Sequence, residues 1–125
     1  MMRTVLSCWA FAVLLVLAAA GCGGGDKPTY SSAQLAEGKK LFLQTCFACH
    51  GAEGKGIPNL GKDMTTSEFI KGNTDDEMLA FLHTGRRADH PLNTTKVDMP
   101  PKGGNPALTD DQLRAIIAHV RTLSR

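Results

Sequence analysis

The sequence predicts an all-α domain, and three helix-start signatures support this prediction. Each has a serine or threonine three residues before a glutamine or glutamate, at Ser31–Gln34, Thr74–Glu77 and Thr109–Gln112. In such a capping box the two side chains bond the first free backbone N–H groups of a helix. Apolar residues at helical spacing follow all three signatures. We therefore expect three main helices.

The first helix is expected to begin near Ser31 or Ser32 and to run toward Cys46. Gly38 and Phe42 lie eight and four residues before Cys46, so all three are close to one helical face. Glycine costs about 1 kcal/mol of helix propensity relative to alanine. A close crossing with another helix would explain Gly38, and a solvent-facing glycine is the alternative.

Two shorter helices are expected in the middle of the chain. One covers about residues 67–71, and the clearer one covers 74–84, where Gly85 provides a stop. Met78 lies on the apolar side of the clearer helix, and Met64 precedes both. A methionine within a helical apolar pattern usually packs in the core, so we interpret both as core residues.

The last helix is expected to begin at Thr109. Its apolar residues recur at helical spacing and are Leu113, Ile116, Ile117, Val120 and Leu123.

The N-terminal segment 1–21 is typical of a secretory signal peptide, with Arg3 followed by an apolar run over 5–20. Small residues precede Cys22, as in the lipobox of bacterial lipoproteins. That resemblance implies that Cys22 becomes the lipid-bearing N-terminus. An uncleaved transmembrane anchor is one alternative, although the run is short for a span of about 20 residues. Simple cleavage near Ala20 is the other.

The chain is therefore divided into a signal peptide over 1–21, a flexible linker over 22–31 and a folded domain over 32–125. All three interpretations of the N-terminus locate the domain outside the cytoplasmic membrane, on the periplasmic side. The lipoprotein interpretation also anchors it to a membrane through Cys22.

Cys46, Cys49 and His50 form the attachment signature of c-type haem, in which two residues separate the cysteines and histidine follows at once. Each thiol can form a thioether with one vinyl group of the porphyrin, and the spacing lets both sulfurs reach the ring edge. We expect one haem c attached through Cys46 and Cys49. His50 would be an axial ligand of its iron.

Two other sites use paired cysteines. A redox disulfide between Cys46 and Cys49 would require a preceding strand and a thioredoxin-like βαβ pattern. A zinc site would require a second pair of cysteines or histidines at finger spacing. The sequence has neither pattern, so haem attachment is the favoured interpretation.

Met99 ends a long polar connection over 86–98 and is followed by Pro100 and Pro101. Long connections are often functional. Because proline restricts the backbone, this context would present the methionine side chain at low entropic cost.

The series Gly38, Phe42, Cys46, Cys49 and His50 resembles a class I monohaem cytochrome c, and the resemblance extends over about residues 33–124. It implies a cytochrome c-like fold, in which the N-terminal and C-terminal helices cross around a covalently bound haem.

The resemblance also implies roles for single residues. Met99 would be the distal axial ligand, opposite His50. The carbonyl of Pro58 would accept a hydrogen bond from the second ring nitrogen of His50 and so fix its tautomer. His119 falls where the family usually has an aromatic residue of the last helix, and we expect it to pack against the first helix.

Five further side chains have open roles. His83, His90 and His119 are alternative candidates for the distal ligand. Arg86 and Arg87 either pair with haem propionates, since arginine suits carboxylates, or remain solvated.

The expected ligand pair and the lack of catalytic motifs together indicate electron transfer. The formal net charge of +2, from 14 basic and 12 acidic residues, gives no basic field for a nucleic acid. The sequence has no catalytic carboxylate pair, nucleophile–base pair or phosphate loop. A His/Met pair raises the reduction potential and leaves no open coordination site. We therefore expect an electron carrier rather than an enzyme.

Expected partners are redox proteins such as a quinol-oxidising complex or a terminal oxidase. Four lysines in the loops beside the haem could steer an acidic partner; they are Lys55, Lys62, Lys96 and Lys102.

Two other functions remain open. The domain could be a fixed cytochrome c subunit of a respiratory complex. It could also be a haem sensor or peroxidase-type enzyme, which would require a displaceable sixth ligand.

Overall fold

The first and last helices cross at close range, as the sequence predicts. A Cβ atom at Gly38 would lie 1.8 Å from the carbonyl oxygen of Ala115 and 3.2 Å from the Cβ of His119. Phe42, one turn further on, is fully buried and packs edge-to-face on the ring of His119, with 5.3 Å between the ring centroids. Gly38 is therefore explained by the crossing.

The computed structural model describes residues 28–124. The expected signal peptide, Cys22 and most of the expected linker lie outside these residues. The described elements are α1 (Ser32–Thr45), α2 (Phe47–His50), α3 (Glu68–Gly72), α4 (Asp75–Thr84), the 3₁₀ helix η1 (Pro101–Gly104) and α5 (Asp110–Leu123).

The described part of the chain is all-α, which confirms the predicted class. It contains two isolated antiparallel bridges, between Ile57 and Gly61 and between Arg86 and Met99, and no named strand. Within residues 28–124, none of the helices combines the length and the apolar character needed to cross a membrane.

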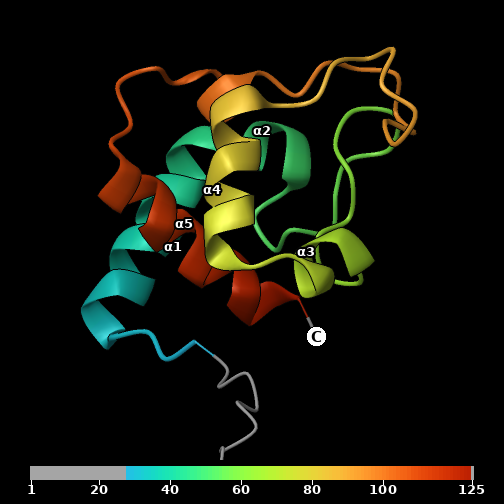
Figure 1. Cartoon of the computed structure of the whole chain (residues 1–125). Helices are drawn as coiled ribbons and strands as arrows, with labels where there is room; N and C mark the ends of the chain where they lie inside the picture. The colour runs from blue at the N-terminus through green and yellow to red at the C-terminus, as the bar shows by residue number, and fades with distance from the viewer. Residues whose placement is uncertain (1–27, 125) are drawn as a thin grey trace, which may run out of the picture.

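Figure 1 shows α4 packed in front of the α1–α5 crossing, with α2, α3 and the loops on the side opposite the start of α1. The core lies between these helices. Its largest fully buried side chains are Phe42 of α1 and Leu113 and Ile117 of α5.

The predicted helix starts are confirmed. Thr74 and Thr109 each form a complete capping box with the residue three positions later. Ser31 accepts a hydrogen bond from the backbone of Gln34 at 3.1 Å, which is the hydroxyl half of a box. The short helix α3 begins after Ser67, whose side chain accepts from Ile70.

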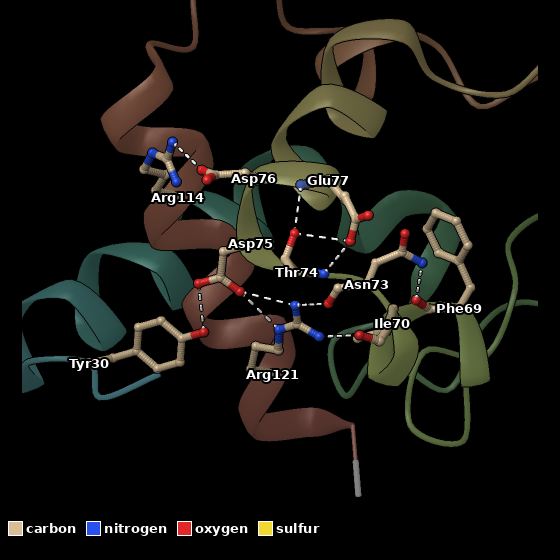
Figure 2. Close-up of polar contacts among 10 residues, drawn as sticks. All are labelled: Tyr30, Phe69, Ile70, Asn73, Thr74, Asp75, Asp76, Glu77, Arg114 and Arg121. Atoms are coloured by element: carbon tan, nitrogen blue, oxygen red, sulfur yellow. Dashed lines mark hydrogen bonds and ion pairs between the residues drawn. The ribbon is translucent and has the colours of Figure 1, made fainter. Parts of the chain in front are cut away.

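A polar cluster ties α5 to the helices beside it (Figure 2). Arg121, only 17% exposed, lies 3.0 Å from Asp75 at the start of α4. It also donates to the backbone carbonyls of Ile70 and Asn73, at the end of α3. Tyr30 donates to Asp75 at 2.8 Å, and burial together with this bond raises the pKa of Tyr30 to about 12.

We predict that Gly38→Ala lowers the free energy of unfolding of the haem-loaded protein by about 2 kcal/mol or more, because the new methyl group forces the helices apart. This loss outweighs the gain in helix propensity. Denaturant unfolding measures it. Gly72→Ala is the matched control, because a Cβ there meets nothing within 4 Å. Equal stability of the two variants would contradict the close crossing.

His119 should make the fold sensitive to acid. It is 8% exposed, its Nε2 has no hydrogen-bond partner in the described structure, and burial, with the charge of Lys39, lowers its pKa. The unfolded state, with a pKa of about 6.5, therefore binds a proton more readily. This contribution to stability is complete above that pH and is lost as the pH falls toward the lowered folded-state value.

We predict that His119→Phe flattens the fall in stability between pH 7 and pH 5, because phenylalanine keeps the packing on Phe42 and cannot titrate. Unfolding curves across this pH range measure the change. His90→Gln, at an exposed site, is the control and should keep the wild-type profile. An acid profile unchanged by His119→Phe would show that His119 does not contribute to it.

Candidate functional site

One cavity brings together Cys46, Cys49, His50 and Met99. Its walls come from α3, α4, α5 and the connecting loops, and are largely built of apolar side chains. Those from helices include Phe69, Ile70, Met78, Phe81, Leu82, Ile116, Ile117 and Val120.

The two cysteines lie at the junction of α1 and α2. Cys46 caps α1 through a bond from its N–H to the carbonyl of Phe42, at 2.8 Å. The N–H groups of Cys49 and His50 then bond back to the carbonyl of Cys46, at 3.2 and 3.0 Å. Residues three and four apart on a helical turn share a face. This turn therefore directs all three side chains to the cavity.

Both cysteines carry half-buried free thiols. Burial, with a smaller contribution from the charge of Cys49, raises the pKa of Cys46 to about 11. The Cys46 sulfur is therefore a neutral thiol at physiological pH.

His50 is oriented by a backbone carbonyl. Its Nδ1 lies 2.9 Å from the carbonyl oxygen of Lys62. Because a carbonyl only accepts, Nδ1 must carry the proton, which leaves the lone pair on Nε2 for a metal. Burial lowers the pKa of His50, against the opposing effect of the Lys62 bond. The neutral imidazole is thus the favoured form.

The prediction that the Pro58 carbonyl accepts the hydrogen bond from His50 is wrong, because the carbonyl of Lys62 accepts it. Ile57 and Gly61 bond to each other in both directions at 3.1 Å and close a tight turn. Pro58 lies exposed at the tip of this turn, with Asn59 in the left-handed region at φ 60°. The chain reaches His50 only after the turn has closed.

Gly61 brings the returning chain close to α2. A Cβ atom at Gly61 would lie 2.1 Å from the carbonyl oxygen of Cys49. Only glycine allows this approach, and Lys62 follows directly. Sequence reasoning missed Lys62 because its contribution is a main-chain carbonyl, which any residue type provides. The glycine before it was the only available signal.

Met99 lines the cavity from the end of the long connection that follows α4. Its N–H and carbonyl pair with the carbonyl and N–H of Arg86, both at 2.8 Å. Gly85 ends α4 with φ 66°, and a Cβ there would lie 2.2 Å from the Met99 carbonyl oxygen. The end of α4 therefore fixes the Met99 backbone.

Arg86 and Arg87 differ in their surroundings. The Arg86 guanidinium lies over the rings of Phe69 and Phe81, 4.7 and 4.8 Å from their centroids, and it lines the cavity. Arg87 does not line the cavity, and it pairs with Asp89 at 3.2 Å. Only Arg86 is therefore available to a carboxylate inside the cavity.

Of the four histidines, His50 alone lines this cavity. His83 pairs with Asp110 at 2.9 Å. His90 is exposed and accepts a bond from the N–H of Leu92. His119 belongs to the helix crossing. The described structure thus offers none of these three as a distal ligand.

Two other methionines are also candidates for the distal ligand. Met64 and Met78 also line the cavity. Met78 is 5% exposed and belongs to the core, and Met64 packs against that core. Both therefore fit the predicted packing role and serve as controls for Met99.

Two of the four loop lysines have partners within the domain. Lys55 pairs with Glu53 at 2.7 Å. The Lys102 ammonium donates to the carbonyl of Leu108, also at 2.7 Å. The steering role expected for the four lysines stays a prediction.

Comparison with known proteins gives one family. A family model described as Cytochrome c matches residues 35–124. Similar sequences include the cbb3-type cytochrome c oxidase subunit FixP of Bradyrhizobium diazoefficiens, 30% identical over 115 residues. The photosystem II extrinsic protein V of Synechococcus elongatus is 36% identical over 107 residues.

The alignments cover 89% and 77% of this chain, but 38% of FixP and 62% of the photosystem II protein. The chain therefore spans less than two thirds of the length of these relatives. Among solved structures, the KustC0563 c-type cytochrome shares the fold at a TM-score of 0.50 and 22% identity. That match covers 70% of this chain and 98% of the other.

Proposed function

The chain belongs to the cytochrome c family, and from that premise we propose that its domain is a one-electron carrier with His50 and Met99 as the axial ligands of haem c. The observation that carries the proposal is the single cavity that both residues line together with Cys46 and Cys49.

The residues of the cavity fit this cofactor. One helical turn presents two thiols, a neutral imidazole is oriented by the Lys62 carbonyl, and a thioether comes from Met99, which lines the same cavity. When bound, the haem supplies an iron that alternates between ferrous and ferric states. Cys46 and Cys49 would hold its ring by thioether bonds, and Met99 would raise its reduction potential.

The remaining walls serve the same function. Apolar side chains from α3, α4 and α5 exclude water from the ring. Arg86, held over Phe69 and Phe81, provides a fixed positive charge for a carboxylate of the cofactor. An electron carrier needs a largely apolar pocket, because the surroundings of its iron must change little between oxidation states.

A sensor or peroxidase-type enzyme is less well supported. Such a protein needs an open or displaceable sixth position. Here the Met99 backbone is held by two hydrogen bonds to Arg86, and the three other histidines do not line the cavity. Electron transfer without substrate binding at the iron is therefore the proposed activity.

The relatives suggest where the electrons go. FixP is by name a subunit of a cbb3-type cytochrome c oxidase, and its similarity extends over 89% of this chain. We propose a terminal oxidase as the acceptor and a quinol-oxidising complex as a donor. A fixed subunit of such an oxidase is the second candidate, favoured by the same similarity.

The N-terminal sequence adds a location to the proposal. A signal peptide over 1–21 would bring the domain to the periplasmic side of the membrane, with Cys22 as the lipid-bearing first residue after cleavage. A lipid tether suits both a carrier and a subunit, because it keeps the domain near membrane-bound partners.

We predict that Met99→Ala abolishes the weak long-wavelength iron–sulfur band of the oxidised protein and lowers its reduction potential, because the thioether ligand is lost. Optical spectra and a redox titration measure both. Met64→Leu and Met78→Leu are the controls and should keep the band. The reduced wild type should not bind carbon monoxide, whereas reduced Met99→Ala should. A band that survives in Met99→Ala would refute the ligand assignment.

We predict that the full-length protein partitions into the detergent phase and that Cys22→Ser moves it to the aqueous phase, because the lipid is attached to that sulfur. Cys8→Ser, within the apolar run, is the matched control and should not change the partitioning. Purification in mild detergent distinguishes a free carrier from a fixed oxidase subunit, because a carrier elutes alone and a subunit co-purifies with its partner proteins. Partitioning unaffected by Cys22→Ser would refute the lipid anchor.

A further inference from the structure

A buried asparagine lies inside the connection that leads to Met99. We call residues 85–99, from the end of α4 to Met99, the Met99 loop. Asn93 is only 4% exposed and lines the cavity, although every residue from 87 to 98 except Asn93, Ala88 and Thr95 is exposed. A buried amide is costly unless its donors and acceptor are all paired.

The donor half of the Asn93 amide joins the two arms of the loop. Its Nδ2 donates to the carbonyl of Arg87 at 2.9 Å, on the arm that leaves α4. It also donates to the carbonyl of Val97 at 2.7 Å, on the arm that enters Met99. A longer contact of 3.5 Å reaches the carbonyl of Arg86.

The acceptor half fixes the turn before Met99. The Oδ1 of Asn93 accepts from the N–H and the hydroxyl of Thr95, at 3.2 and 3.0 Å, and from the N–H of Lys96 at 3.0 Å. The backbone of Lys96 has φ 60°, a left-handed conformation that residues other than glycine rarely adopt. The hydrogen bond that the Lys96 N–H donates to Asn93 stabilises this conformation.

The two halves together set the position of the Met99 backbone. Val97 lies two residues before Met99, and Arg86 pairs with Met99 in both directions. The Asn93 side chain therefore joins Arg87, the neighbour of Arg86, to Val97, which lies two residues before Met99. We propose that Asn93 is a positioning residue that holds the Met99 thioether toward the haem iron against displacement. This inference rests on the proposed ligation by Met99.

A merely structural role would have a different signature. If Asn93 only stabilised the loop, its replacement would lower the melting temperature and leave the iron–sulfur bond as strong as before. If it positions Met99, its replacement would increase the fraction of molecules in which the sulfur has left the iron. An added ligand that competes with Met99 would then bind more tightly.

The experiment measures the affinity of the oxidised, haem-loaded protein for imidazole, which competes with Met99, together with the reduction potential and the melting temperature. We expect Asn93→Ala to bind imidazole about tenfold more tightly or more, since a bond network worth at least one net hydrogen bond is lost. Its reduction potential should also fall.

Two further variants complete the test. Thr95→Val removes only one bond to Oδ1 and keeps the shape of the side chain, so it should fold normally and show a smaller increase in affinity. Asn105→Ala is the matched control: Asn105 lies beyond η1, where its Oδ1 accepts one bond, from the N–H of Ala107 at 3.2 Å. It should bind imidazole as the wild type does.

Wild-type imidazole affinity in both Asn93→Ala and Thr95→Val would overturn the inference, even if the melting temperature fell. Increased affinity in Asn105→Ala equal to that in Asn93→Ala would overturn it too, because any loosened loop would then suffice. If Met99→Ala keeps the iron–sulfur band, both the proposed ligation and this inference fail. If only the Asn93 and Thr95 variants behave as wild type, the ligation stands.

Discussion

The close contact of α1 and α5 at Gly38 is the constraint on which the rest of the structure depends. It brings the start and the end of the domain together and buries Phe42 against His119. Because α1 leads directly into Cys46, the crossing also fixes the direction in which the cysteine-bearing turn leaves the core. α4 packs on this pair (Figure 1). The cavity is lined by residues of α2, α3, α4 and α5 and of the connecting loops.

The functional site is supported mainly by backbone groups. The carbonyl of Lys62 orients His50, and the main chain of Arg86 holds that of Met99. Two glycines make these approaches possible, because a Cβ at Gly61 or Gly85 would overlap the neighbouring backbone. The side chains that would reach the iron are thus presented by rigid main-chain contacts, which suits a cofactor whose surroundings should stay constant during electron transfer.

The charges of the domain serve chiefly to join its parts. Arg121 links α5 to α3 and to Asp75 of α4, and Tyr30 adds the segment before α1 to the same cluster (Figure 2). Lys55 and Lys102 are likewise held within the domain.

Local spacing and residue type were enough to predict α1, α3, α4 and α5, the attachment motif and the family. The short helices α2 and η1 were not predicted. The sequence also predicted the crossing at Gly38 and the packing of His119. Only the tertiary structure decided which groups meet across the cavity. Lys62 takes the role expected of Pro58 because a tight turn intervenes, and Arg86 faces the cavity whereas Arg87 faces solvent. The buried amide of Asn93 was likewise hidden, because its partners are mainly backbone atoms brought together by the path of the loop.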